Sequence, residues 1–406
     1  MLAGLRVRSA SGSVADVYIV DGARTPIGKF GKSLRNLSAV ELAAITIKAL
    51  VEKTGIPKDR IQALLMGHVI RAGTGMNTAK QSALKAGLGE DVIASNVDMV
   101  CASGMRAVID ASIYVSQGYY DLVVAGGAES MSNSPFFLGS RVRWGVKLVY
   151  RGSLDVFDSM VYDGLRDPIY GLVMGDEADY TAKLHGVTRE ELDWVGYESH
   201  RRAGEAWDKG FFKEHVVPVD LGDGRTLEVD EGIIWDPDME YFKSLKPAFS
   251  SDGLHTKGTS SQLSDGAAFL VLASRSAVEE LGLKPKARIV GWSFSSLDPR
   301  RFPEAPIFAI EYLLKRLGWS VNSVDYWENN EAFAVNSVLM NRMLGVSYDV
   351  LNVNGGAIAL GHPLGMSGAR ILLELVYTLN RRGGRRGIAS ICHGLGGAAA
   401  VAVEML

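Results

Sequence analysis

Apolar residues recur along most of the chain in the spacings of buried strands and amphipathic helices. The segment 39–54 repeats apolar residues at helical spacing, and the apolar run at 61–70 predicts a buried strand. Strands are also predicted at 93–100, running directly into Cys101, and at 121–132, opening into a glycine loop. The alternation continues with a first strand ending at Val20, helices at 106–119, 306–318 and 367–383, strands at 266–274 and 288–295, and two closing strands within 386–405.

The pattern weakens between residues 133 and 245, where aromatic and charged residues become denser and turns more frequent. We therefore predict an α/β protein with a first half at 1–132, an inserted loop domain at 133–245, the remainder of the first half at 246–284, and a second half at 285–406. In each half a glycine-containing loop precedes a helix, a strand and a glycine turn, which favours two similar halves. The alternation of strands and helices predicts mostly parallel strands covered by helices.

Composition narrows the class of protein. The chain has 406 residues, of which 47% are hydrophobic and 22% charged, as expected for a globular protein with a large core. Its formal net charge of -3 leaves no basic surplus for a nucleic acid, and its apolar runs are shorter than the ~20 residues of a membrane helix. Having only two cysteines, the chain is expected in a reducing, cytoplasmic setting, with an organellar matrix left open by the arginine- and serine-containing start.

Both cysteines occupy an unusual position, because each lies where a strand meets glycine-rich backbone. Cys101 precedes Ala-Ser-Gly and a predicted helix. A free cysteine thiol has a pKa of about 8.5, and the N-terminus of this helix is expected to lower that pKa and so favour the thiolate. Cys392 ends a predicted strand and begins His-Gly-Leu-Gly-Gly. A buried structural cysteine is the alternative at either position, but the shared context favours chemistry at both.

Two further polar residues are candidates for the same site. His362 lies in a glycine-dense loop before a helix, where an imidazole can polarise a thiol or donate to an oxyanion. Asn330 is expected to open a helix, as an ordinary N-cap, as a residue that holds a water, or as both.

These residues fall in five motifs that resemble those of the thiolases: VCASGMRA, GGAESMS, NEAFA, GHPLGMSGAR and CHGLGG, in family order. The resemblance begins at VYIVDGARTPIGKF and extends to the last strand. It implies a layered α-β-α-β-α thiolase fold of two similar halves with an inserted loop domain. It further implies the condensation of two acetyl-CoA molecules to acetoacetyl-CoA, and the reverse thiolysis, through an acyl-cysteine. A two-step covalent route of this kind predicts ping-pong kinetics.

The resemblance also implies a role for each residue. Cys101 would take the acyl group, His362 would activate it and help to bind one oxyanion, and Cys392 would remove the α-proton. Asn330 would hold a water in the same oxyanion site, while the N–H groups of Cys101 and Gly394 would form the second one.

For binding, the resemblance places Ser261 near the pantetheine arm of coenzyme A and Phe249, Phe333 and Met174 in the acyl pocket, with core packing as the alternative for both phenylalanines. Two residues depart from the family pattern. Lys257 would either meet a phosphate of coenzyme A or point to solvent, and His393 would either tune Cys392 or fill space.

Alternative functions follow from the same residues. A ketosynthase would use one cysteine with two histidines or with a histidine and an asparagine, and His362 and His393 are compatible with this alternative. Ketosynthases, however, lack a second active cysteine at the position of Cys392. A longer-chain degradative 3-ketoacyl-CoA thiolase and a non-catalytic acyl-CoA-binding scaffold on the thiolase fold stay open. The spacing of cysteines and histidines offers no zinc site, and neither a metal nor a redox cofactor is implied. Family resemblance implies acyl-CoA substrates and a homo-dimer or homo-tetramer.

Overall fold

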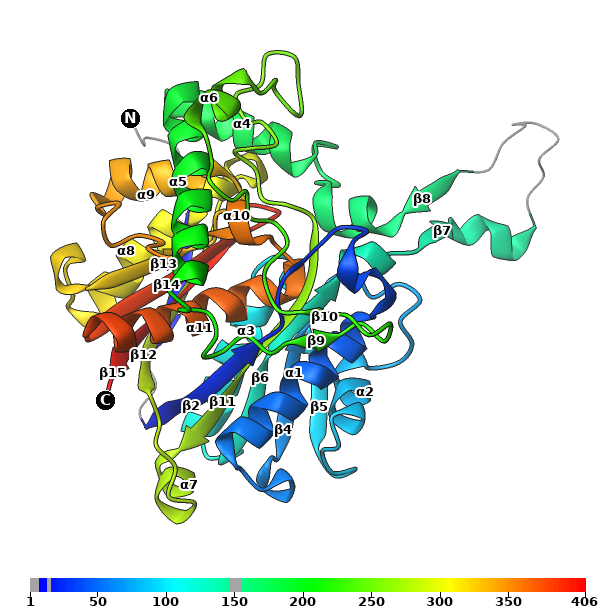
Figure 1. Cartoon of the computed structure of the whole chain (residues 1–406), viewed down its shortest axis with the longest axis vertical. Helices are drawn as coiled ribbons and strands as arrows, with labels where there is room; N and C mark the ends of the chain where they lie inside the picture. Colours follow the sequence, from blue (N-terminus) through cyan, green and yellow to red (C-terminus); the bar gives the residue numbers. More distant parts are fainter. Residues whose placement is uncertain (1–6, 13–15, 146–154) are drawn as a thin grey trace.

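The computed structural model describes residues 7–12, 16–145 and 155–406. Its core is one mixed sheet in which the strands run in the order β13-β14-β15-β12-β2-β11-β6-β4-β5, with β1 added beside β12 and β3 beside β11 (Figure 1). The bounds are β1 Arg8–Gly12, β2 Val17–Arg24, β3 Gly28–Lys29, β4 Ala63–Gly67, β5 Ile93–Val97, β6 Leu122–Ser130, β11 Ser264–Ser274, β12 Ala287–Ser296, β13 Tyr326–Asn329, β14 Arg386–His393 and β15 Gly397–Met405.

The strand order repeats itself, because β2-β11-β6-β4 in the first half corresponds to β12-β15-β14-β13 in the second. The halves meet where β2 pairs with β12 through Tyr18 and Ile19. Helices α3 and α11 pack against strands of both halves and against each other, whereas α1 covers the outer face of the first half and α8 that of the second. The expected layered arrangement of two similar halves is therefore confirmed. The core helices are α1 Ala39–Thr54, α2 Thr78–Lys85, α3 Ser103–Ser116, α7 Arg275–Glu280, α8 Ala305–Leu317, α9 Ala334–Leu344, α10 Ala357–Leu360 and α11 Leu364–Arg382.

The prediction of mostly parallel strands is wrong. Within the described residues, β4 pairs in parallel with β5 and β6, and β13 with β14, whereas the pairings among β2, β6, β11, β12, β14 and β15 are antiparallel. The parallel pairs are those whose strands are joined by helical crossovers. The long excursion between β6 and β11 brings the chain back in the opposite direction, which the local alternation does not reveal.

The segment 133–245 contributes helices and two short ribbons beside the core (Figure 1). The ribbon of β7 and β8 projects from the body (Figure 1), whereas α5 packs against α6, α9 and α10. The division into domains at residues 132, 245 and 284 stays a prediction. The elements of this segment are β7 Phe136–Leu138, β8 Val156–Asp158, α4 Met174–Leu184, α5 Arg189–Asp208, β9 Val219–Asp220, β10 Thr226–Leu227 and α6 Met239–Ser244.

Several predicted elements begin and end where the sequence indicates. Helix α1 covers the predicted 39–54, starting with a capping box from Ser38 to Glu41 and ending at Gly55 with a φ of 67°. Strand β5, by contrast, ends at Val97 rather than running into Cys101. The two boundaries differ in origin, because the helix carries its own local caps, whereas β5 ends level with its partner β4, whose last residue Gly67 pairs with Val97.

Glycines allow the first turns of α3 and α11 to interlock. A Cβ on Gly104 would lie 2.6 Å from the carbonyl oxygen of Gly365, and one on Gly127 would lie 2.0 Å from the same oxygen. Across the contact, a Cβ on Gly368 would lie 2.5 Å from the amide nitrogen of Met105. Because no real side chain tolerates such distances, only glycine permits this approach, which brings the residues preceding α3 and α11 together.

None of the helices in the described parts of the chain is long and apolar enough to cross a membrane.

Candidate active site

Cys101 lies in the sharp turn between β5 and α3. Val100 has a φ of 48°, a left-handed conformation that is strained for a β-branched residue. Ser103 holds the turn, since its hydroxyl accepts from the Met99 N–H at 2.8 Å and donates to the Val100 carbonyl at 2.6 Å. The strained turn presents Cys101 to a cavity that it lines.

The expected thiolate at Cys101 is not what the structure favours. Burial raises the pKa of Cys101 to about 12, although hydrogen bonds from the N–H of Gly394 and from its own N–H act in the opposite direction. Desolvation thus outweighs the helix terminus, and the resting thiol is neutral. The same two N–H groups are those predicted to form an oxyanion hole. A neutral thiol needs a base before it can attack.

Cys392 lies at the end of β14 and is completely buried. Burial raises its pKa, and the charge of Cys101 raises it further, so the two sulfurs lie close enough to interact electrostatically. The side-chain amide of Asn336 donates to Cys392 Sγ at 3.4 Å and to the Pro303 carbonyl at 3.0 Å. Asn336 therefore supports the charged form of Cys392, a contact that the sequence did not indicate.

His362 directly precedes α11, and its neighbours define its tautomer. Its Nδ1 lies 2.6 Å from Ser367 Oγ, and that hydroxyl donates its own proton to the Pro363 carbonyl at 2.8 Å. Nδ1 must therefore carry the hydrogen, which leaves Nε2 as an acceptor. Burial, together with the charge of Arg370, lowers the pKa of His362 to about 3. The imidazole is neutral at rest, in the state required of a base.

Asn330 does not open a helix, because α9 begins only at Ala334. It follows β13 and is held there by its N–H, which donates to the Ser390 carbonyl at 2.9 Å. Its Oδ1 accepts from Arg370 at 3.3 Å, and its Nδ2 lies 3.5 Å from His362 Nε2. Arg370 thus sets the orientation of the amide, so that the N–H groups of Asn330 face the imidazole.

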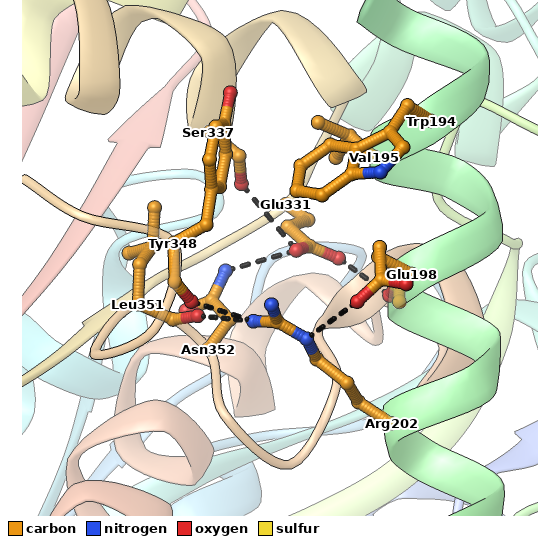
Figure 2. A pocket seen from close by; sticks show the side chains of 10 residues that line it. Trp194, Val195, Glu198, Arg202, Glu331, Ser337, Tyr348, Leu351 and Asn352 are labelled. Carbon is orange, nitrogen blue, oxygen red and sulfur yellow. Dashed lines mark hydrogen bonds and ion pairs between the residues drawn. The ribbon is translucent and has the colours of Figure 1, made fainter.

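A buried carboxylate anchors the loop that carries Asn330. Glu331 accepts from Ser199 of α5 at 2.6 Å, from Asn352 at 3.0 Å and from Ser337 of α9 at 3.3 Å (Figure 2). Arg202 crosses the same small cavity to the carbonyls of Tyr348 and Leu351 (Figure 2). These contacts tie α5 of the segment 133–245 to the NEAFA motif of the second half.

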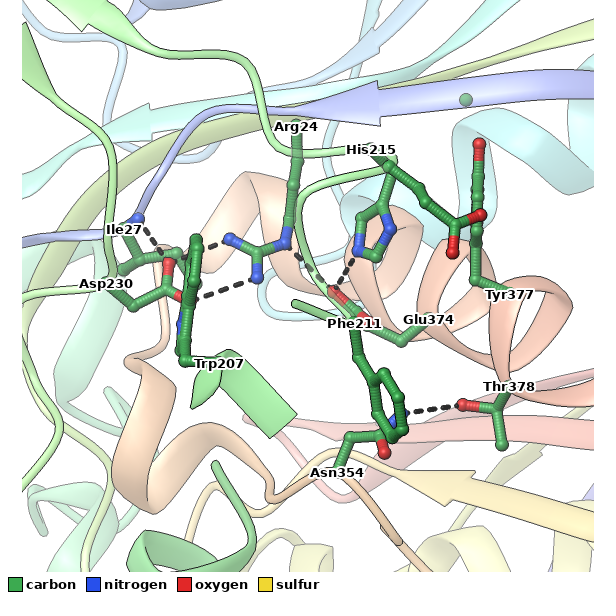
Figure 3. A network of polar contacts seen from close by, with 12 residues as sticks. Arg24, Ile27, Trp207, Phe211, His215, Asp230, Asn354, Glu374, Tyr377 and Thr378 are labelled. Atoms are coloured by element: carbon green, nitrogen blue, oxygen red, sulfur yellow. Dashed lines mark hydrogen bonds and ion pairs between the residues drawn. The ribbon is translucent and has the colours of Figure 1, made fainter. Parts of the chain in front are cut away.

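A second buried network of polar side chains contacts α11 through Glu374 (Figure 3). Arg24 forms a two-point pair with Asp230 at 2.7 and 3.0 Å and contacts Glu374 at 2.9 Å, where His215 also lies at 2.9 Å. Burial opposes the ionisation of Glu374, but His215 and Arg24 outweigh it and lower its pKa to about 2. The carboxylate is therefore charged and helps to compensate Arg370, one turn earlier on α11.

The site opens into a cavity of about 460 Å³. Cys101 and His362 line it together with Ser261, Met174, Phe249 and Phe333, so the predicted binding residues share one cavity. Cys392 is not among the lining residues. Gly394 lines a neighbouring cavity of about 570 Å³, which Met174 and Gly164 separate from the first.

The structure thus places Cys101, His362 and the four predicted binding residues on one cavity, whereas Cys392 is outside its lining and Gly394 lines the neighbouring cavity. The chemical roles of these residues stay predictions. Sequence reasoning missed Asn336, Ser367 and Arg370. The last two lie five and eight residues after His362, inside a motif already noted, and this proximity was the available signal. His393 donates from Nδ1 to the Gly394 carbonyl at 2.7 Å, beside the predicted oxyanion hole.

Two buried thiols, a neutral buried imidazole and preorganised N–H groups beside an apolar cavity define a cysteine-dependent acyl-transfer enzyme. Comparison with known proteins agrees. The model of the thiolase N-terminal domain matches residues 17–276, and that of the C-terminal domain matches residues 283–405. The chain belongs to the thiolase family.

Individual relatives match over nearly their whole length. An acetyl-CoA acetyltransferase from Synechocystis sp. is 45% identical over 392 residues, covering 96% of this chain and 99% of the relative. The crystal structure of the Bacillus anthracis acetyl-CoA acetyltransferase superposes with a TM-score of 0.92 at 37% identity, covering 97% of this chain and 100% of that one. The Acat5 thiolase from Ascaris suum, in complex with coenzyme A, gives a TM-score of 0.91 at 37% identity, with the same coverage.

Proposed function

We propose that this protein is an acetyl-CoA acetyltransferase, which condenses two acetyl-CoA molecules to acetoacetyl-CoA and coenzyme A and catalyses the reverse thiolysis. The observation that carries the proposal is the placement of Cys101 and His362 on one apolar cavity. Cys392 supports it, because its thiol interacts electrostatically with Cys101. The full-length relatives of that name support the same activity.

In the first half-reaction His362 Nε2 takes the proton of Cys101, whose sulfur attacks the thioester carbonyl. The oxyanion accepts from the N–H groups of Cys101 and Gly394, which already point at the sulfur. Coenzyme A leaves as a thiol after taking the proton of Cys392. The acyl group is then on Cys101, His362 is protonated, and Cys392 is a thiolate supported by Asn336.

In the second half-reaction the Cys392 thiolate removes the α-proton of the next acetyl-CoA. The enolate oxygen accepts from protonated His362 and from a water held by Asn330, whose N–H groups face the imidazole. The carbanion attacks the acyl group on Cys101, the C–S bond breaks, and the Cys101 sulfur recovers its proton from His362. Protons and charges balance over the two steps.

We also propose a homo-oligomer and a reducing, cytoplasmic location. The projecting ribbon supports self-association, because Phe136, Leu138 and Val156 expose apolar surface there. The need for two free thiols supports the reducing compartment. Light scattering on the protein and on a Phe136→Ser, Leu138→Ser variant tests the first point, and a smaller mass of the variant is expected.

The test of function is turnover of purified protein with acetyl-CoA, acetoacetyl-CoA and longer 3-ketoacyl-CoA thioesters. We expect acetoacetyl-CoA formation with ping-pong kinetics and an acetyl group on Cys101 detectable by mass spectrometry. Cys392→Ser should still accept the acetyl group from an activated ester but form no product. Cys101→Ser should do neither.

The alternatives predict other results. A scaffold would bind acyl-CoA without turnover, and iodoacetamide would label Cys101 slowly and without protection by acetyl-CoA. A degradative enzyme would cleave longer 3-ketoacyl-CoA substrates in preference to acetoacetyl-CoA. Either result would replace the proposed function.

A further inference from the structure

The cavity that holds Cys101 and His362 is almost free of charge. Within the described part of the chain, its lining consists of apolar side chains, glycines, Ser260, Ser261 and Gln262, with Lys257 as the only permanently charged member. Cys101 and His362 at one end are buried, whereas Lys257 is exposed to solvent. The cavity therefore runs from a neutral, buried end to an exposed cationic end.

The backbone around Lys257 is fixed by a tight turn. The Thr256 N–H donates to Thr259 Oγ1 at 2.7 Å, and the Gly258 N–H donates to Thr256 Oγ1 at 3.1 Å. Gly258 packs closely against α5, where a Cβ on Gly196 would lie 2.2 Å from its carbonyl oxygen. A rigid turn thus holds the lysine at the cavity edge at little cost in backbone entropy on binding.

The charge of Lys257 is uncommitted. Over the residues that the structure describes, no carboxylate lies within ion-pair distance of its Nζ, whereas Lys243 pairs with Glu240 at 2.7 Å and Lys183 with Asp252 at 2.7 Å. The Lys257 Nζ lies instead 5.7 Å from the ring centroid of Tyr241, a weak cation–π contact that leaves its three donors available.

We propose that Lys257 binds a phosphate group of the acyl-CoA substrate and so determines affinity for the nucleotide part of the thioester. This proposal rests on the proposed function, since it names a specificity contact of the same site. An acyl-CoA has an uncharged thioester arm and an anionic phosphate end, which matches the neutral and cationic ends of the cavity. Lysine is a common phosphate ligand and acts there as a compact point charge.

The contact concerns binding and not chemistry, because Lys257 is exposed to solvent whereas the reacting groups Cys101 and His362 are buried. It stabilises the ground state and the transition state equally, so it lowers KM and leaves kcat unchanged. For a solvent-exposed ammonium on a multiply charged phosphate, its removal is expected to raise KM about three- to tenfold.

The experiment compares thiolysis of acetoacetyl-CoA and of acetoacetyl-pantetheine, which lacks phosphates. Lys257→Ala should raise KM about three- to tenfold with the CoA substrate, leave kcat unchanged, and have no effect with the pantetheine substrate. Lys257→Arg should restore KM. Lys243→Ala, which removes an exposed lysine already paired with Glu240, is the matched control and should behave as the unmodified enzyme.

Two further measurements separate the outcomes. Dephospho-CoA as the acceptor distinguishes the 3′-phosphate from the pyrophosphate, because the effect of Lys257→Ala persists only if the pyrophosphate is the partner. An unchanged KM with CoA, or equal rises with CoA and pantetheine substrates, overturns the proposal. If the unmodified enzyme turns over neither substrate, the proposed function fails, and calorimetric binding of coenzyme A to the unmodified protein and to Lys257→Ala still decides the role of Lys257.

Discussion

Replacing Asn336 with alanine removes a hydrogen bond to the more deeply buried thiol. The side-chain amide donates to Cys392 Sγ at 3.4 Å and to the Pro303 carbonyl at 3.0 Å, while its oxygen accepts from the Phe333 N–H at 3.0 Å. The amide lowers the pKa of Cys392 against the effect of burial, so its loss should raise that pKa further.

The size of the effect follows from the kind of bond. A hydrogen bond to a charged group contributes about 1.5–3 kcal/mol. At about 1.4 kcal/mol for each factor of ten, condensation should slow by roughly 10- to 150-fold. Folding should also suffer, because losing the contact at the start of α9 costs about 0.5–2 kcal/mol and leaving the Pro303 carbonyl unpaired costs about 1–3 kcal/mol.

The assay separates chemistry from stability. An acetyl donor such as p-nitrophenyl acetate releases an anion that needs no proton, so acylation of Cys101 by this donor does not require Cys392. We expect Asn336→Ala to give a normal burst of nitrophenolate but slow formation of acetoacetyl-CoA. The alkaline part of the condensation pH profile should move to higher pH, because a thiol of raised pKa ionises later.

Asn341→Ala is the control for a weakened helix. Asn341 lies on the same helix, α9, and donates to the Val346 carbonyl at 3.0 Å without contact to either cysteine. It should be less stable than the unmodified enzyme but kinetically normal. The reasoning is refuted if Asn336→Ala slows the burst and the condensation equally, or if Asn341→Ala slows condensation as much.

Three further predictions concern orientation, chain length and acid stability. Arg370→Lys should free the Asn330 amide to rotate and slow condensation about 10- to 100-fold while sparing the p-nitrophenyl acetate burst; equal losses in both would mean a general folding defect. Met174→Ala should join the two cavities. In thiolysis assays it should raise kcat/KM for 3-ketohexanoyl-CoA relative to acetoacetyl-CoA about tenfold. An unchanged ratio would mean that another wall of the cavity limits the length of the acyl chain. Burial opposes the ionisation of Glu374, but His215 and Arg24 lower its pKa to about 2. The contribution of this carboxylate to the free energy of unfolding should therefore be present above pH ~4.5 and lost as the pH falls towards 2. Glu374→Gln should flatten this part of the pH profile of denaturation, and an unchanged profile would contradict the role of Glu374.

Much of the fold could be predicted because its signals are local. The periodicity of α1 and its caps, and the apolar run of β6, are contained in the elements themselves. The strand directions could not be predicted, since they depend on how the chain returns after the long segment between β6 and β11. The early end of β5 likewise depends on a tertiary contact, because β5 ends level with its partner strand β4.

The site was predictable to the extent that its residues stand in unusual local settings. Cys101, Cys392 and His362 each adjoin glycine-rich backbone, which marks them in the sequence. Asn336 and Arg370 sit inside helices, where a polar side chain usually faces water, and their roles became visible only once their buried partners were known. The pKa of Cys101 was misjudged for the same reason, because burial cannot be read from one helix terminus.

The close approach of Gly104, Gly127 and Gly365 has a consequence for how this enzyme can diversify. Because these contacts join backbone to backbone, no side chain lies between helices α3 and α11 at these points. Substitutions therefore cannot change the distance between the helices by small steps. The separation of nucleophile and base is therefore locked against gradual mutation. New substrate preferences must arise in the walls around the thioester, where single substitutions change shape and charge without moving the reacting atoms.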